Sequence, residues 1–311
     1  MKRYRTLKLT VAVLAVSLAC GMLALVAEAK VRVVSTTTMV TDMVRQVGGD
    51  RVEVTGLMGP GVDPHLYKPA ALDVPKLSGA QVIFYNGLML EGRMADLFSR
   101  MARQGKKVYA VTEGIPEKEL LEPESFEGHW DPHVWGDPRL WAKCVDVVVQ
   151  GLSEAEPAGK TYFTERGAKL KSEYAKLYDW AKKRIEEVPK ARRVLITSHD
   201  AFNYFGQAFD IEVVGVQGIS TVTEAGLADI TKAVDFIRQR RVKAIFVESS
   251  VSPATIQRIS KDAGVKVGGE LFSDACGAPG EMHQGGGESY DVGTYIGMIK
   301  HNVNTVVEAL K

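Results

Sequence analysis

The hydrophobic pattern alternates between short β-branched runs and longer segments with helical periodicity. Strands are predicted at Val31–Ser35, Val52–Leu57, Val82–Tyr85, Val108–Val111, Val194–Thr197, Ile211–Val216, Ala244–Val247 and Lys266–Gly268. Helices are predicted at Met39–Val47, Ala71–Leu77, Trp141–Glu154, Ala225–Arg240 and Pro253–Ala263, the fourth with a capping box at Thr221-Val222-Thr223-Glu224. This alternation predicts an α/β fold with parallel sheets covered by helices.

The middle of the chain has a different pattern. Lys160–Val188 contains no proline and a single glycine, Gly167, and is rich in Lys, Glu, Ala, Leu and Tyr. It predicts one helix of roughly 28 residues, about 42 Å long, that ends before Pro189. We interpret it as a rigid helix joining two lobes, residues 30–159 and residues 189–311. The alternative is an ordinary surface helix in one larger domain.

The extreme N-terminus resembles an export signal. Leu9–Val26 is almost entirely apolar, follows a cationic start, and precedes Ala27-Glu28-Ala29, which has small residues at the positions that a signal peptidase reads. We predict a signal peptide at residues 1–29 and a periplasmic or extracytoplasmic protein. An uncleaved membrane anchor ranks second, because the apolar run is long, and lipidation at Cys20 ranks third.

Charge and cysteine content narrow the function further. Without residues 1–29 the chain has 35 basic and 37 acidic residues, a net charge of −2. This balance excludes nucleic acid as a probable partner. Cys144 and Cys276 are the remaining cysteines, too few for a disulfide framework, and they are either free or paired. We expect a monomer.

Three histidines and one aspartate are candidate metal ligands. His65 follows the second predicted strand, His199 lies where a strand precedes a helix, and Asp274 lies just beyond the last predicted strand. His133 shares with His65 the tripeptide Asp-Pro-His. Ligands gather at the carboxyl ends of strands in open α/β sheets, and three imidazoles with one carboxylate suit a divalent transition metal. Taken singly, each histidine is more often a cap or a satisfied polar group than a ligand, and Asp274 is more often a helix cap or a turn residue.

Four motifs, in this order, carry a family resemblance: Gly59-Pro-Gly-Val-Asp-Pro-His65-Leu-Tyr-Lys-Pro69, Asp131-Pro-His-Val-Trp135, Ser198-His-Asp-Ala-Phe202 and Gly269-Glu-Leu-Phe-Ser-Asp274. They resemble the metal-site motifs of the metal-binding solute-binding proteins of ABC transporters, the family of TroA, ZnuA and PsaA, and the TroA-like members most. The resemblance implies two (β/α) lobes bridged by one long helix, with a metal in the cleft. It implies His65 and His133 as ligands from the first lobe, and His199 and Asp274 from the second. It also implies a permease and its ATPase as partners, with the metal as transported cargo.

The resemblance bears on the choice of metal. Members regarded as manganese-selective tend to carry Glu where this chain has His199. A shell richer in nitrogen favours Zn²⁺, so zinc ranks first and Mn²⁺ second. Zinc-dedicated members usually have a long loop rich in histidine and acidic residues. The matching stretch here, Pro116–Gly128, is short, acidic and free of histidine.

Other candidates have weaker assignments. Glu248 is either a residue that orients a ligand histidine or a plain carboxylate at a strand end. We interpret His129 as a surface residue, His301 as structural, and His283 as part of a mobile loop at Glu281–Ser289. Three aromatic residues are expected to wall the site: Trp135, Phe202 and Tyr204.

Two other functions remain open at this stage. A zinc hydrolase would need three protein ligands, an open position for water and a general base. Four candidate ligands and the lack of a His-Glu-x-x-His segment argue against that function. A surface adhesin on the same scaffold is the other alternative, and no feature of the sequence tests it.

Overall fold

The computed structural model describes residues 29–311, of which Val31–Lys311 form one compact unit. The signal segment, with its cleaved, anchored and lipidated alternatives, therefore lies almost entirely outside the described residues. Within the described part, no helix has both the length and the apolar character needed to cross a membrane.

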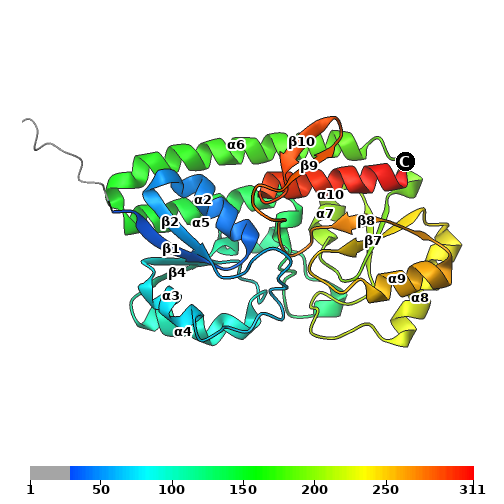
Figure 1. The fold of residues 1–311 in the computed structure, drawn as a ribbon, viewed down its shortest axis with the longest axis horizontal. Helices are drawn as coiled ribbons and strands as arrows, with labels where there is room; N and C mark the ends of the chain where they lie inside the picture. The colour runs from blue at the N-terminus through cyan, green and yellow to red at the C-terminus, as the bar shows by residue number, and fades with distance from the viewer. Residues whose placement is uncertain (1–28) are drawn as a thin grey trace, which may run out of the picture. The chain divides into compact units, whose positions relative to one another are not determined.

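The first lobe is built on a parallel sheet with strand order β2-β1-β3-β4 (Figure 1). Its strands are β1 (Val31–Ser35), β2 (Val52–Gly56), β3 (Val82–Tyr85) and β4 (Lys107–Ala110). Its helices are α2 (Thr38–Gly48), α3 (Asp73–Gly79), α4 (Ala95–Arg103) and α5 (Pro138–Ala155). In the middle of the sheet, Val33 of β1 pairs with Val54 of β2 and with Val82 of β3, and Val33 and Val82 are buried. The burial of β3 explains its unbroken apolar run, whereas β1 is buried except at Arg32.

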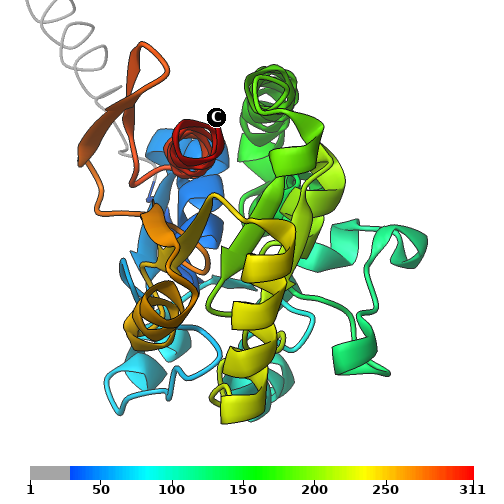
Figure 2. The same ribbon diagram turned by 90° about the vertical axis from the view of Figure 1, so that its right-hand side faces the viewer.

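A long helix, α6 (Lys160–Ile185), runs beside α5 and links the two halves of the chain (Figures 1 and 2). Its 26 residues span about 39 Å, which confirms the predicted bridging helix with an end three residues before the predicted one. Buried residues recur every three or four positions along one side of α6: Phe163, Gly167, Leu170, Tyr174, Leu177, Ala181 and Ile185. Gly167 allows the approach to α5, because a Cβ there would lie 2.5 Å from a methyl group of Val149.

The second lobe contains two parallel strand pairs, β5 (Val194–Thr197) with β6 (Glu212–Gly215), and β7 (Ala244–Glu248) with β8 (Lys266–Leu271). Its helices are α7 (Asn203–Phe209), α8 (Leu227–Arg240), α9 (Ala254–Ala263) and α10 (Tyr295–Leu310).

Short 3-10 turns connect elements along the whole described chain. They lie at Gly49–Arg51, Gly92–Met94, Val111–Gly114, Glu117–Glu119, Glu124–Phe126, Val134–Gly136, Pro157–Gly159 and Lys190–Arg192. The predicted two-lobe α/β fold with parallel sheets is therefore confirmed.

Two local predictions were wrong. The stretch predicted as a mobile loop at Glu281–Ser289 contains an antiparallel hairpin, β9 (Met282–Gly285) and β10 (Glu288–Asp291). The predicted capping box at Thr221 does not begin a helix. Helix α8 begins after Gly226, whose N–H donates to Asp229 Oδ2 at 3.0 Å, and Thr221 is buried in a contact described below.

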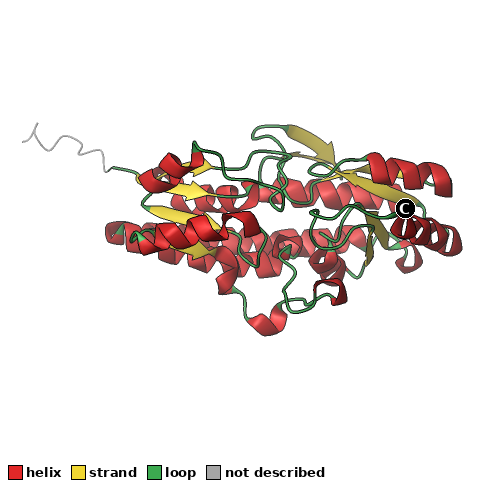
Figure 3. Ribbon diagram, turned by 90° about the horizontal axis from the view of Figure 1, so that it is seen from below, coloured by secondary structure: helices red, strands yellow, loops and turns green. Residues whose placement is uncertain are grey.

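One hydrophobic core runs through both lobes. It includes Val33 and Phe84 of the first sheet, Tyr174 of α6, Leu195 of β5 and Phe246 of β7. The strands gather in two groups with the long helices running alongside (Figure 3). Because apolar packing is continuous from one group to the other, we expect the lobes to move little against each other. The lobe limits at residues 159 and 189 remain predictions.

Candidate metal centre

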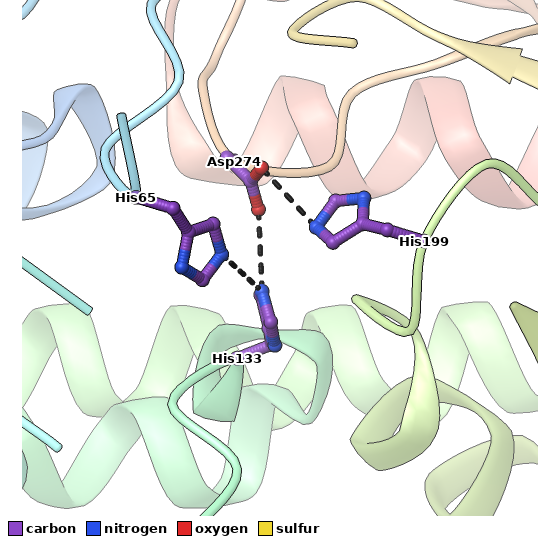
Figure 4. A group of neighbouring side chains, drawn as sticks. All are labelled: His65, His133, His199 and Asp274. Carbon is purple, nitrogen blue, oxygen red and sulfur yellow. Dashed lines mark hydrogen bonds and ion pairs between the residues drawn. The ribbon is translucent and has the colours of Figure 1, made fainter. Parts of the chain in front are cut away.

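The four predicted ligands converge in one place. The candidate ligand atoms of His65, His133, His199 and Asp274 all lie within 4.8 Å of one another (Figure 4). His65 lies in the loop after β2, His133 immediately precedes the 3-10 turn before α5, His199 follows β5, and Asp274 follows β8. All four side chains are buried. Residues far apart in the sequence thus form one cluster with contributions from both lobes.

The spacing of the ligand atoms suits a tetrahedral metal ion. His65 Nε2 lies 3.2 Å from His133 Nε2. Asp274 Oδ1 lies 3.5 Å from His133 Nε2, and Asp274 Oδ2 lies 3.3 Å from His199 Nε2. Ligand atoms bound tetrahedrally at about 2.05 Å from Zn²⁺ are about 3.3 Å from each other. Three of the separations between candidate ligand atoms are therefore close to those of a tetrahedral metal site.

Unsatisfied polar atoms at the centre support the same interpretation. His199 Nε2 and Asp274 Oδ1 are fully buried and make no hydrogen bond within the described residues. Burying polar atoms without partners is costly. A cation bound between these atoms would satisfy both of them.

Asp131 orients His133. The carboxylate Oδ1 of Asp131 lies 2.8 Å from His133 Nδ1 and accepts the His133 backbone N–H at 2.9 Å. Asn203 Nδ2 donates to the other oxygen of Asp131 at 3.0 Å. With Nδ1–H donated to a carboxylate, the lone pair of His133 Nε2 is directed to the centre. No role was predicted for Asp131 from the sequence, although the repeated Asp-Pro-His tripeptide was a signal for it.

Glu248, for which two interpretations were open, lies against His199. Its Oε2 is 2.6 Å from His199 Nδ1, and its Oε1 accepts the His199 backbone N–H at 3.0 Å. Burial lowers the pKa of His199, but the charges of Glu248 and Asp274 outweigh it and raise the pKa well above its ordinary value. In the metal-free protein His199 is therefore an imidazolium held between two carboxylates.

His65 is held differently. Asp63 Oδ1 accepts the His65 backbone N–H at 2.8 Å, which fixes the loop. This carboxylate oxygen therefore binds the His65 backbone and not its ring. Asp63 Oδ2 accepts the hydroxyl of Thr221 at 2.5 Å, which ties this loop to the second lobe. Burial is the largest influence on the ring and lowers the pKa of His65 to about 3. His65 is thus neutral and available as a ligand at neutral pH.

The segment that carries Asp274 is tied to its surroundings by hydrogen bonds. Ser250 Oγ donates to Asp274 Oδ2 at 3.2 Å. Trp135 Nε1, from the first lobe, donates to the carbonyl oxygen of Ser273 at 2.8 Å. Burial would raise the pKa of Asp274, but the neighbouring His199 charge outweighs it and lowers that pKa. Asp274 therefore remains a carboxylate in the buried site.

Of the three aromatic residues predicted to wall the site, one packs against a ligand ring and one makes a hydrogen bond instead. The ring of Trp135 packs edge-on against His133 with centroids 5.3 Å apart. Phe202, three residues after His199 in the sequence, is buried. Tyr204 instead donates its hydroxyl to the carbonyl oxygen of Asp131 at 3.0 Å. A polar tip on a buried tyrosine here stabilises the loop that positions His133.

The remaining candidates lie outside the four-residue cluster. Cys144 and Cys276 are both buried free thiols, which settles that they are not paired. Burial raises the pKa of both thiols, and a protonated thiol is a poor metal ligand. His129 is exposed, as predicted, and packs its ring near Phe126.

Comparison with known proteins places the sequence in context. The family model described as "ZnuA: Zinc-uptake complex component A periplasmic" matches residues 33–309. The manganese-binding lipoprotein MntA of Bacillus subtilis (strain 168) is 41% identical over 290 residues, which cover 92% of this chain and 91% of MntA. The zinc-binding protein TroA of Treponema pallidum (strain Nichols) is also 41% identical, over 289 residues that cover 91% of this chain and 90% of TroA.

The fold agrees with the sequence comparison. The solved structure of the periplasmic zinc-binding protein TroA from Treponema pallidum superposes with a TM-score of 0.85, covering 90% of this chain and 99% of that one. Two relatives of equal identity carry different metals in their names. Overall similarity therefore leaves the choice of metal to the chemistry of the centre.

Proposed function

Because this chain belongs to the ZnuA family of metal-binding solute-binding proteins, we propose that it captures a divalent transition metal outside the cytoplasm and delivers it to an ABC permease and its ATPase. The ligands in this proposal are His65, His133, His199 and Asp274. The metal is cargo and not a resident cofactor. Export by the N-terminal signal, cleaved or retained, is part of the same proposal.

One observation carries the proposal: four buried candidate ligand atoms, two from each lobe, lie within 4.8 Å of one another, and three of their separations are 3.2–3.5 Å. A hydrolytic zinc site keeps one coordination position open for water. In this proposal four protein groups fill the shell of the bound ion, an arrangement that suits tight capture. Because the ligands come from two lobes, a small relative tilt separates them and releases the ion.

The donor set favours zinc over manganese. Three imidazole nitrogens and one carboxylate are borderline-soft ligands, and intrinsic affinity rises from Mn²⁺ to Zn²⁺ in the same direction. We propose Zn²⁺ as the first cargo and Mn²⁺ as the second. Competition between the two ions, after the purified protein has been stripped, tests this order.

His199→Ala is the decisive variant for the centre. Removing this imidazole leaves three ligands and a buried cavity beside Glu248, so we expect tight metal binding to be lost. Metal analysis after stripping and reloading, with isothermal titration, measures stoichiometry and affinity. His129→Ala is the matched control, because His129 is an exposed imidazole outside the cluster. Unchanged stoichiometry and affinity in His199→Ala would overturn the ligand assignment.

A further inference from the structure

A second pair of histidines lies outside the metal centre. The β9–β10 hairpin packs against α10 (Figure 2), and this brings His283 of β9 next to His301 of α10. Their Nδ1 atoms are 3.1 Å apart, and the ring centroids are 5.0 Å apart. From the sequence, His283 was predicted to lie in a loop and His301 to be structural, and no contact between them was predicted.

The outer nitrogen of each ring faces an atom that can only accept a hydrogen bond. His301 Nε2 lies 2.9 Å from the carbonyl oxygen of Glu270, with the hydroxyl of Thr305 also 3.4 Å away. His283 Nε2 lies 3.0 Å from the carboxylate Oε1 of Glu281. Carbonyl and carboxylate oxygens have no proton to give, so these two shorter contacts favour the N–H on Nε2 of each ring.

This proton assignment leaves two lone pairs facing each other. A neutral imidazole that is protonated at Nε2 has an unprotonated Nδ1. In the neutral pair both Nδ1 atoms therefore direct lone pairs at one another across 3.1 Å. Such a contact needs a cation between the rings, either a proton or a metal ion.

The geometry accommodates a metal ion. Two nitrogens 3.1 Å apart, each about 2.05 Å from an ion, subtend about 98° at that ion, between the octahedral and tetrahedral angles. The separation is close to the 3.2 Å between His65 Nε2 and His133 Nε2 in the main centre. A ligand histidine commonly donates its other N–H to a carboxylate or carbonyl group, and both rings here do so.

The surroundings allow access for a hydrated ion. Both rings border a cavity of about 410 Å³ that is also lined by Glu270, Glu308 and Thr305. The His283 side chain is 33% exposed, and Phe272 packs edge-on against His301 with centroids 4.9 Å apart. Two ring nitrogens beside this open cavity leave the remaining coordination positions of the ion to water.

We propose that His283 and His301 form an accessory site for a borderline-soft divalent cation of the Zn²⁺ class, bound through both Nδ1 atoms. The site is separate from the four-residue centre and does not rest on the transport function proposed above. Its affinity is lower than that of the main centre, because it offers two protein ligands instead of four.

Zinc titration of the full chain tests the proposal. We expect wild-type protein to take up a second Zn²⁺ after the main centre is filled, and His283→Gln to lose that step while it retains the first. The matched control is His129→Gln, which removes an imidazole that has no histidine partner among its ring contacts. A second step that survives in His283→Gln, or its absence from wild-type protein, would overturn the accessory site.

Three further measurements keep the test independent of folding defects and of the main centre. Glu281→Gln leaves both imidazoles in place and removes the carboxylate behind His283, so we expect the second step to weaken by about tenfold. In His199→Ala the second step should persist even though the first is lost. Nitrogen NMR of the imidazoles should show both Nδ1 signals shifting with the second Zn²⁺. A proton shared between the rings that zinc does not displace would contradict the proposal.

Discussion

The two halves of the metal centre prepare their ligands in opposite ways. In the first lobe, burial dominates at His65 and lowers its pKa to about 3, so this imidazole is neutral. In the second lobe, burial at His199 is outweighed by Glu248 and Asp274, which raise the pKa of His199. His65 can thus bind a metal ion directly through its lone pair, whereas His199 must first lose a proton.

This difference shows how a buried site remains electrically balanced without its ion. A buried carboxylate such as Asp274 needs a partner, and the His199 imidazolium supplies it in the metal-free state. A divalent cation replaces that proton and brings additional charge, which Asp131 and Glu248 help to balance from behind the histidines. The metal-binding equilibrium is therefore coupled to a proton on one side of the cleft.

The largest effect is expected from Asp274→Asn, which removes the anionic ligand on which both halves converge. Metal affinity should fall by more than about 100-fold, beyond the range seen for residues that only orient ligands. The metal-free protein should also melt at a lower temperature at neutral pH, because the His199 imidazolium loses a carboxylate. Titration calorimetry and thermal melts measure the two effects. Asp235→Asn, an exposed carboxylate of α8, is the control, and an affinity within tenfold of wild type would refute the assignment.

Glu248→Gln should change the pH dependence of binding. In the wild type the raised pKa of His199 means that metal uptake near neutral pH releases about one proton, so apparent affinity falls about tenfold for each pH unit below that pKa. The same raised pKa stabilises the metal-free fold below about pH 6.5, and this contribution is lost as pH rises through the folded value. Without the Glu248 charge the pKa of His199 falls, and both dependences become shallower.

Calorimetry in buffers of different ionisation enthalpy counts the released protons. The variant should release fewer protons than the wild type at pH 7, while the stoichiometry of tight binding remains one metal at the centre. Equal proton release in both proteins would show that Glu248 does not set the protonation of His199. Thermal melts of the metal-free proteins across the pH range provide the independent check on the same linkage.

The two Asp-Pro-His motifs provide a matched pair for a smaller effect. Asp131 contacts both the backbone N–H and the ring of His133, whereas Asp63 binds the backbone N–H of His65 and the hydroxyl of Thr221. Asp131→Asn should lower metal affinity about 10- to 100-fold, and Asp63→Asn by less than about tenfold. Dissociation constants of the two variants, measured side by side, decide whether ring contact is what distinguishes the motifs. Equal losses would mean that the aspartates act only through the loops.

Much of this architecture follows from local sequence signals. Val82–Tyr85 and Val194–Thr197 are strands with the predicted limits, because buried parallel strands are continuous β-branched runs. The α6 helix was evident from its length and its lack of proline. The four centre residues were predicted from their motifs, and the structure places their side chains in one cluster.

The rest depends on tertiary contacts that no local pattern contains. The role of Glu248 depends on β7 lying beside β5, which places the end of one strand next to His199. The β9–β10 hairpin has three consecutive glycines at its turn, which favoured a loop, and it is fixed by packing on α10. Thr221 has the sequence of a helix cap, but its hydroxyl binds Asp63 in the other lobe. A side chain with two possible hydrogen-bond partners is assigned only by the fold.

That contact between Thr221 and Asp63 provides the finest test of how the two halves cooperate. Thr221→Val keeps the shape of the side chain and removes the hydroxyl that ties the His65 loop to the second lobe. We expect metal to leave about two- to fivefold faster, the effect of one hydrogen bond of modest net strength, with little change in the association rate. Release into excess chelator measures it, and Thr223→Val, exposed in the same loop, is the control. If Thr221→Val releases metal at the wild-type rate, the lobes are held by their shared core and by the metal itself, and this hydrogen bond has no part in retention.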